Sequence, residues 1–392
     1  MTAEGGAKRL LGNAVLIAGS VVVAFILGEI VLRLVGFTDP VLWTYDDVTG
    51  SRLYAGASGV FETEGRSYVT VSSAGLRDRE HAVAKPANTV RIAVLGDSMA
   101  EALQVPQEKG FASLLESSLK GCKAWGGREV EVINFGVSGY GTAQELLTFR
   151  HRARAYSPDI TVLSFYAGND IANNSRALEP NKLRPFFVVK DGKLELDDGF
   201  LRDPEYHAFK STFELRSMLF GLRTFQLARR VKNIAQQWWE ARGGPPRTDT
   251  IEPGESDKIF FPPSTAAWKD AWDVTGRLMV QLRDEVAAAG GHLVVVSLPV
   301  AIEAYPDAES RARFMKKLGV SDLWHADRWL RDLAERENLD AITLGQRFQS
   351  YADTHHEYLY GFKNVRMGTG HLNENGHRLV AEALAERLCP AP

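Results

Sequence analysis

The sequence Gly96-Asp97-Ser98 directly follows a short apolar run at residues 90–95, and this junction constrains the fold more than any other feature. The β-branched run is typical of a buried strand, and apolar residues recur at helical spacing from Phe111 onward. Ser98 is therefore predicted to lie on a turn that leads from a strand into a helix. Reactive groups collect at such strand ends in open α/β sheets. A serine that only caps the following helix would give the same local pattern.

Strand and helix patterns alternate along the rest of the chain. Further buried strands are expected at residues 131–135, 159–166, 293–298 and 341–344. Such alternation is typical of a parallel sheet with helices on both faces. We therefore predict an α/β protein, a flavodoxin-like three-layer sandwich with a parallel sheet, whose core is formed by residues 89–170 and 264–390.

Three further segments contain groups that would suit a catalytic site. A glycine-rich turn at residues 136–141 contains Gly139, Asn169 follows the strand expected at residues 159–166, and His371 precedes the last amphipathic helix. A serine hydroxyl is a good nucleophile only when a base takes its proton. A developing oxyanion needs hydrogen-bond donors that are in place before the reaction begins. The four segments together supply both kinds of group.

These segments resemble the ordered Ser, Gly, Asn and His blocks of the SGNH hydrolases, also called GDSL lipases and esterases. The resemblance implies an SGNH fold with Ser98 as the nucleophile and His371 as the base. It also implies an oxyanion hole made of the Ser98 N–H, the Gly139 N–H and the Asn169 side-chain amide, with no cofactor and no metal. Ala100, two residues after Ser98, differs from the Gly-x-Ser-x-Gly elbow of α/β-hydrolases.

One position departs from the family pattern. An aspartate usually stands three residues before the histidine, and here that position is Gly368. Three explanations are open: a dyad of Ser98 and His371 that uses a backbone carbonyl, an acid from elsewhere such as Asp353 or Glu374, or an inactive site. We expect a Gly368→Asp substitution to leave the fold intact and to raise esterase activity or change it little.

The N-terminal stretch is long and apolar enough to cross a membrane. Residues 10–28 carry no charge, the apolar pattern continues to residue 36, and Lys8 and Arg9 precede it. The positive-inside rule places residues 1–9 in the cytoplasm and the chain beyond residue 36 outside it. A cleaved signal peptide is the alternative, but no clear small-x-small cleavage site follows the stretch. We therefore predict a single-pass anchor at residues 10–36.

Two accessory regions are expected beside the core. Residues 37–88 are predicted to form a strand-rich juxtamembrane segment, and residues 171–263 to form an insertion that begins with a hairpin at residues 186–196. Within the insertion, residues 205–247 hold eight Lys or Arg against three Glu, together with several Phe and Trp. We interpret this part as a helical cap whose aromatic face covers the core. A surface that touches anionic headgroups or a membrane partner is the alternative.

Two residue pairs and one histidine have more than one interpretation. Cys122 and Cys389 would face an oxidising compartment under the predicted topology, where they form one disulfide or remain two buried thiols. Glu29 and Arg33, one helical turn apart, pair near the membrane interface or mark a contact with a helix partner. His377, within the last helix, is expected to be structural.

The net charge of −3 gives no reason to expect nucleic-acid binding, and the sequence has no zinc-type spacing, Walker loop or dinucleotide fingerprint. The prediction is an extracytoplasmic, membrane-anchored serine esterase or O-acyltransferase that acts on O-acyl groups, most simply O-acetyl groups, of a cell-envelope glycan through an acyl-serine intermediate. The glycan and a membrane-bound O-acyltransferase partner are implied by the resemblance to anchored SGNH proteins. There are two alternatives. One is a lipase or lysophospholipase, and the other is a non-catalytic assembly subunit of an envelope acylation complex.

Overall fold

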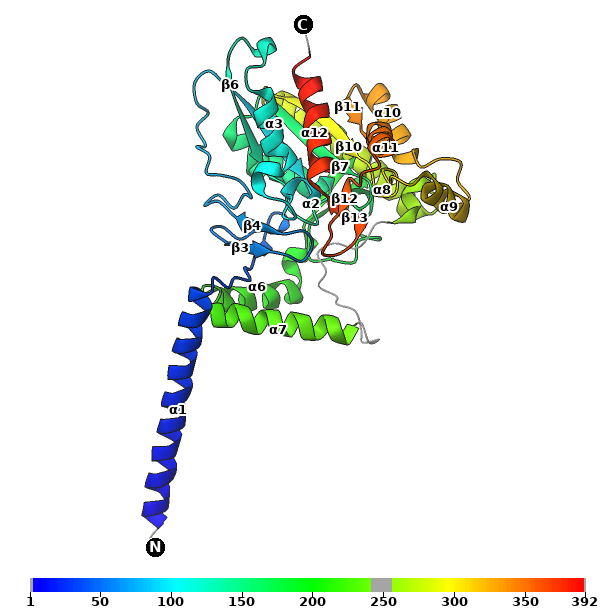
Figure 1. Ribbon diagram of the computed structural model, residues 1–392. Coiled ribbons are helices and arrows are strands. Elements are labelled where there is room, and N and C mark those ends of the chain that lie inside the picture. Colours follow the sequence, from blue (N-terminus) through cyan, green and yellow to red (C-terminus); the bar gives the residue numbers. More distant parts are fainter. Residues whose placement is uncertain (1–2, 241–255, 391–392) are drawn as a thin grey trace. The chain divides into compact units, whose positions relative to one another are not determined.

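The computed structural model describes residues 3–240 and 256–390 of the chain (Figure 1). The chain divides into two compact units. One comprises Met1–Val41 and Lys210–Arg247, and the other comprises Leu42–Phe209 and Thr248–Pro392. Each unit is described by itself below.

The larger unit is built around a five-stranded parallel sheet. Its strands, in spatial order, are β11 (Asp340–Thr343), β10 (His292–Leu298), β7 (Ile160–Tyr166), β5 (Thr89–Gly96) and β6 (Glu129–Asn134). Numbered along the chain, these five core strands have the order 2-1-3-4-5, read from β6 to β11, which is that of flavodoxin-like folds. The predicted α/β fold with a parallel sheet is therefore confirmed, and each expected core strand is present.

Helices cover both faces of this sheet, which makes a three-layer structure (Figure 1). Successive residues of β5 point to opposite faces: Ile92 and Val94 belong to one hydrophobic cluster, and Ala93 and Leu95 to the other. The first cluster is completed by α3 (Phe111–Leu119), α11 (Gly345–His355) and α12 (Glu374–Leu388). The second is completed by α4 (Thr142–His151), α8 (Ala266–Ala288) and α10 (His325–Glu337).

Shorter elements connect these layers. Two hairpins lie outside the main sheet, β8 (Phe186–Lys190) with β9 (Lys193–Asp197) and β12 (Tyr360–Gly361) with β13 (Met367–Leu372). The remaining α-helices of this unit are α2 (Ser98–Glu101), α5 (Asp170–Asn173) and α9 (Ala308–Leu318). Short 3-10 helices span Gln107–Lys109, Lys123–Trp125, Ala153–Tyr156, Gly199–Arg202 and Asp257–Phe260.

The segment before the core forms two small antiparallel hairpins, as its β-branched and aromatic content predicts. They pair β1 (Trp43–Asp46) with β2 (Gly50–Leu53) and β3 (Ser58–Phe61) with β4 (Ser67–Thr70). Leu53 and Val69 of these hairpins pack with Leu103, Val137 and Tyr140 of the core in a third hydrophobic cluster. The packing fixes the hairpins beside the glycine-rich turn that follows β6.

The smaller unit contains α1 (Ala3–Leu34), α7 (Arg223–Glu240) and the end of α6 (Pro204–Ser217). Within α1, Leu11–Leu34 is long and apolar enough to cross a membrane, and its most apolar 18-residue window contains no buried residue. That the aromatic face of residues 205–247 covers the core stays a prediction, and the structure adds the exposure of the side chains on α7 itself. Its side chains Val231, Trp238 and Trp239 are all more than half exposed. An amphipathic period identifies an apolar face, but not whether protein or another medium covers that face.

Cys122 and Cys389 form a disulfide. The bond joins the chain just after α3 to the end of α12, and these two helices pack against each other on one face of the sheet. Of the two states that the sequence left open, the disulfide is the one in the structure.

Candidate active site

Ser98 and His371 lie within hydrogen-bond distance at the carboxyl edge of the sheet. Ser98 is the first residue of α2, directly after β5, and only 3% of it is exposed. His371 lies near the end of β13, and its Nε2 atom is 3.0 Å from Ser98 Oγ. A base at this distance and position can take the hydroxyl proton. The structure thus brings together the two residues that the first and last sequence blocks contain.

The acid beside His371 is Glu64, which the sequence did not point to. Glu64 Oε2 lies 2.5 Å from His371 Nδ1, and Glu64 Oε1 accepts a hydrogen bond of 2.9 Å from the His371 backbone N–H. The carboxylate therefore holds both the ring and the backbone of His371. With Nδ1–H bound to the carboxylate, Nε2 is left as the acceptor that faces Ser98.

Glu64 lies in the turn between β3 and β4, and several contacts hold this turn on the hairpin that carries His371. Asn364 accepts a hydrogen bond of 3.0 Å from Gly65 N–H and donates one of 2.9 Å to Gly65 C=O. Gly65 has a φ of +66°, and a Cβ there would overlap the carbonyl oxygen of Gln104. Ser67 Oγ donates to the Leu103 carbonyl on the other side of the turn. These contacts fix the acid relative to the base.

Two positions just before His371 are glycines, each for a different structural reason. Gly370 has a φ of +74°, and a Cβ there would overlap Glu64 Oε1, so the missing side chain is what admits the carboxylate. Gly368 has a φ of +77°, and a Cβ there would overlap the Tyr305 ring and lie 2.9 Å from Tyr358 Cε1. That Gly368→Asp leaves the fold intact stays a prediction, but the new side chain must strain the backbone and displace the Tyr305 ring.

The two acids proposed from the sequence are engaged elsewhere. Asp353 forms an ion pair of 2.8 Å with Arg311, and Glu374 one of 3.4 Å with Lys109. Of the explanations left open for Gly368, the structure has an acid from elsewhere, but that acid is Glu64. The backbone carbonyl is not needed, since a carboxylate occupies its place.

Asp97 connects the nucleophile turn to Asn169. Its Oδ1 accepts a hydrogen bond of 2.9 Å from the Met99 N–H and so caps α2, while its Oδ2 accepts one of 2.8 Å from Asn169 Nδ2. Asn169 follows β7 and is the N-cap residue of α5. An amide nitrogen has two hydrogens, so Asp97 orients the group and leaves its second N–H for another acceptor.

The glycine-rich turn is held by a buried glutamate that sequence reasoning also missed. Glu101, the last residue of α2, is fully buried and accepts hydrogen bonds from the N–H and the hydroxyl of Ser138. Its other oxygen accepts a hydrogen bond of 3.1 Å from Trp43 Nε1. Gly139, the next residue, has a φ of +76°, and its carbonyl accepts a hydrogen bond from Arg184. The turn that carries the Gly139 N–H is therefore held from both sides.

Two buried carboxyl groups lie behind this site. Burial raises the pKa of Glu145 well above its usual range, and the nearby Asp97 raises it further. Burial likewise raises the pKa of Asp170, with Glu145 and Asp97 adding to the effect. Asp170 accepts a hydrogen bond of 2.8 Å from the Tyr166 N–H, and this contact opposes the shift. Both groups therefore keep their protons to higher pH than exposed carboxyl groups do.

His377 lies under α3 and is fully buried, consistent with a structural role. Burial lowers its pKa to about 3, and the charges of Arg77 and His371 add to this effect. Its Nδ1 atom accepts a hydrogen bond of 3.4 Å from the Phe111 N–H, and its ring stacks on that of Phe111. It is thus a neutral acceptor in the folded chain.

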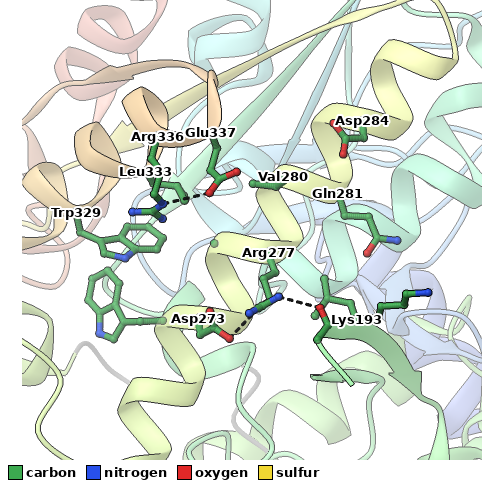
Figure 2. Close-up of a pocket in the computed structure, with 14 residues that line it drawn as sticks. Lys193, Asp273, Arg277, Val280, Gln281, Asp284, Trp329, Leu333, Arg336 and Glu337 are labelled. Carbon is green, nitrogen blue, oxygen red and sulfur yellow. Dashed lines mark hydrogen bonds and ion pairs between the residues drawn. The ribbon is translucent and has the colours of Figure 1, made fainter. Parts of the chain in front are cut away.

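A separate hollow of about 760 Å³ lies between the β8–β9 hairpin, α8 and α10 (Figure 2). Its lining includes Trp272 and Trp329, whose rings meet edge to face with centroids 4.7 Å apart. Charged groups on its rim pair with one another, as Arg277 does with Asp273 (Figure 2). Neither Ser98 nor the groups around it line this hollow. It is therefore distinct from the candidate active site.

Comparisons with known proteins give matches only among solved structures. No protein-family model matches the chain, and no curated protein matches it. The chain is similar to the acetyl xylan esterase AlAXEase, with 16% identity over 76% of this chain and 100% of that one, at a TM-score of 0.39. It is similar to TesA, with 12% identity over 76% and 98% of the two chains, at a TM-score of 0.37. It is also similar to Axe2, an acetylxylan esterase from Geobacillus stearothermophilus, with 13% identity over 77% and 95%, at a TM-score of 0.38. Because these identities and scores are low, the residue roles below rest on the geometry of this chain alone.

Proposed function

We propose that this chain is an SGNH-type serine esterase or O-acyltransferase. The observation that carries the proposal is the line of contacts from Glu64 through His371 to Ser98, with distances of 2.5 Å and 3.0 Å. A hydroxyl, an imidazole and a carboxylate in this order form the arrangement that activates a serine for attack on an acyl carbonyl. The four ordered sequence blocks agree with this assignment.

In the acylation step, Ser98 Oγ forms a bond to the acyl carbon while its proton moves to His371 Nε2. Glu64 stabilises the imidazolium that results, since it faces Nδ1–H. The carbonyl oxygen becomes an oxyanion, and the N–H groups of Ser98 and Gly139 and the free N–H of Asn169 donate to it. Collapse of this intermediate breaks the bond to the alkoxy group, which leaves as an alcohol with the proton from His371. The product is an acyl-serine.

Deacylation repeats these steps with a second hydroxyl compound. His371 takes the proton of the incoming group as that group attacks the acyl carbon. The bond from the acyl carbon to Ser98 Oγ then breaks, and Ser98 Oγ takes the proton from His371. Water as the incoming group gives hydrolysis, and a sugar hydroxyl gives transfer. The same residues serve both reactions, so the acceptor alone separates an esterase from an acyltransferase.

The proposed location follows from the N-terminal helix. Leu11–Leu34 spans the membrane once, with the basic N-terminal flank in the cytoplasm and the larger unit outside. The Cys122–Cys389 disulfide supports this side, since such bonds persist in oxidising compartments. An acyl-transferring enzyme held there meets the polymers of the cell envelope. We therefore propose an O-acetylated envelope glycan as the substrate and a membrane-bound O-acyltransferase as the partner.

Labelling by a fluorophosphonate probe tests the catalytic proposal. The detergent-solubilised full-length chain should be labelled, Ser98→Ala should abolish labelling, and Ser117→Ala, at an exposed serine of α3, should not change it. We expect Asn169→Ala to lower ester turnover by about 10²- to 10³-fold, the usual effect of removing one oxyanion donor. A chain that is not labelled, although it is folded, would be a non-catalytic subunit.

Product analysis tests the substrate. Incubation with an O-acetylated envelope glycan should release acetate in water, or move the acetyl group to an added unacetylated glycan if the chain is a transferase. The same preparation should leave a long-chain lysophospholipid intact. Release of fatty acid without release of acetate would instead assign the site to a lipase.

A further inference from the structure

The helix α7 carries a row of large apolar side chains, here called the stripe, that are exposed in the structure. The stripe consists of Leu227, Val231, Ile234 and Trp238, which follow one another at the spacing i, i+4, i+7 and i+11. At 3.6 residues per turn, these positions fall on one side of the helix. Their exposed fractions are 38%, 56%, 56% and 55%. Large apolar side chains in such a row mark an interaction surface, because water is an unfavourable medium for them.

The first turn of α7 is fixed to α1 by Glu29. Its carboxylate accepts hydrogen bonds of 3.1 Å and 3.0 Å from the N–H groups of Arg223 and Thr224, and another from the Thr224 hydroxyl. These are N–H groups that a helix start leaves without partners, and a negative charge there is stabilised by the helix dipole. At Gly28, a Cβ would already contact Thr224 Cγ2, at 3.7 Å. The two helices are therefore joined at a defined point of α1.

That point coincides with the end of the uncharged part of α1. Leu11–Gly28 contains no charged residue, and at 1.5 Å per residue its length is about 27 Å. The hydrocarbon core of a bilayer is about 30 Å thick. When this stretch spans the core, Glu29 and the N-terminal residues of α7 that it binds lie at the outer boundary of the core.

The contacts of α7 also set the direction in which the stripe faces. On the side opposite the stripe, Arg229 donates hydrogen bonds of 2.6 Å to the Asp39 carboxylate and 2.8 Å to the Pro40 carbonyl. Gln226 on the same side accepts one of 2.9 Å from the Asp39 N–H. Asp39 and Pro40 lie beyond the C-terminal end of α1. The stripe therefore faces the side of α7 on which the membrane-spanning helix lies.

We propose that α7 lies flat in the outer interface of the lipid bilayer, with this stripe among the acyl chains. The proposal rests on the membrane anchorage proposed above. The helix carries four basic residues and one acidic residue, which suits anionic headgroups, and two tryptophans near its end, which suit the interfacial zone. Because Glu29 holds the start of α7 at the outer boundary of the bilayer core, the stripe is already next to the lipid. The surface is thus continuous with the anchor, and its partner is lipid rather than a protein.

Depth-dependent quenching tests this inference. Both native cysteines are in the disulfide, so one added cysteine can carry an environment-sensitive fluorophore. The full-length chain is reconstituted alone into phosphatidylcholine and phosphatidylglycerol vesicles with brominated acyl chains. The labelled positions are Ile234→Cys on the stripe and, as matched control, Lys232→Cys, which is exposed on another side of the same helix. Val22→Cys in α1 reports the anchor, and Val365→Cys reports the larger unit.

We expect bromolipid to quench the fluorophore at positions 22 and 234 to a similar extent, and not at positions 232 and 365. Quenching at position 22 without quenching at 234 would overturn the interfacial helix and leave the anchor in place. Equal quenching at 232 and 234 would also overturn it, since no side of α7 would then select lipid. Absence of quenching at position 22 would contradict the membrane anchor itself, and the inference would fail with it.

Discussion

Replacing Glu64 by glutamine tests the acid that the structure places beside His371. Both carboxylate oxygens act as acceptors, one for the backbone N–H at 2.9 Å and one for Nδ1–H at 2.5 Å. A glutamine has a single acceptor oxygen. If this oxygen accepts from one of the two His371 N–H groups, the amide NH₂ must face the other, which is also a donor. The alternative is a change of tautomer, in which Nδ1 accepts from the amide and Nε2 carries the proton toward Ser98. In that tautomer His371 cannot act as the base.

The size of the effect follows from this geometry. An amide in place of the triad carboxylate of a serine protease lowers turnover by about 10⁴-fold, through the same change of tautomer. The Glu64 and His371 side chains are each 17% exposed, so water can partly replace the lost contact. We therefore expect a loss of about 10³- to 10⁴-fold in kcat. This corresponds to a barrier raised by about 4 to 5.5 kcal/mol.

The assay is hydrolysis of p-nitrophenyl acetate by the solubilised full-length chain, with kcat and KM measured separately. Because Glu64 acts through His371 and not on the substrate, kcat should fall while KM stays nearly constant. Glu62→Gln, at an exposed position two residues away in the same turn, is the matched control and should keep full activity. The Ser98-dependent activity is the difference between the wild-type chain and Ser98→Ala. If Glu64→Gln keeps more than a tenth of this activity, then Glu64 is not the orienting acid.

Three further outcomes are expected. Gly370→Ala should lower kcat about as much as Glu64→Gln while the chain stays folded, because its Cβ displaces the carboxylate; unchanged kcat would mean that the carboxylate position is not critical. Cys122→Ser should lower the free energy of unfolding by about 5 kcal/mol, because the disulfide joins residues 267 positions apart, and an unchanged melting temperature would contradict this. Burial lowers the pKa of His377 to about 3 in the folded chain, whereas the histidine of an unfolded chain has a pKa of about 6.5. As the pH falls below about 6.5, the unfolded chain therefore gains a proton that the folded chain does not bind, and the folded chain loses stability. The free energy of unfolding, measured with guanidinium, should therefore fall between pH 7 and pH 5 by about 2 kcal/mol more for the wild-type chain than for His377→Gln. Equal decreases for the two chains would refute a buried, neutral His377.

Local patterns in the sequence were enough to predict the sheet and three of its site-bearing turns. A buried β-branched run ends at Gly96, and the periodic apolar positions after it define the helix, so Ser98 is placed by its neighbours in the chain. The same holds for Asn169 after β7 and for His371 before α12. Parallel strands bring the ends that carry Ser98 and Asn169 to one edge of the sheet, and this property needs no knowledge of distant contacts. His371 instead reaches this edge from β13 of a hairpin outside the main sheet.

The acid could not be predicted in this way, because its position depends on tertiary structure. Glu64 lies 307 residues before His371, in a short turn with no distinctive motif. The sequence pattern around Gly368 suggested a lost acid, whereas the residue is a glycine because of its positive φ and the rings of Tyr305 and Tyr358. Only Gly370 could have given a signal, since a second glycine next to the base indicates that another group approaches closely.

An acid supplied by the β3–β4 turn makes the segment before the core part of the site. Where acid and base share one loop, the local backbone fixes their distance. Here that distance depends on how the turn docks, through Asn364 at Gly65 and through the cluster that Val69 forms with the core. Loss of this docking would leave Ser98 and His371 in place but remove the carboxylate that orients the imidazole. The hairpins at residues 43–70 therefore have a role beyond linking the N-terminal helix to the sheet, because they determine whether the base is oriented for catalysis.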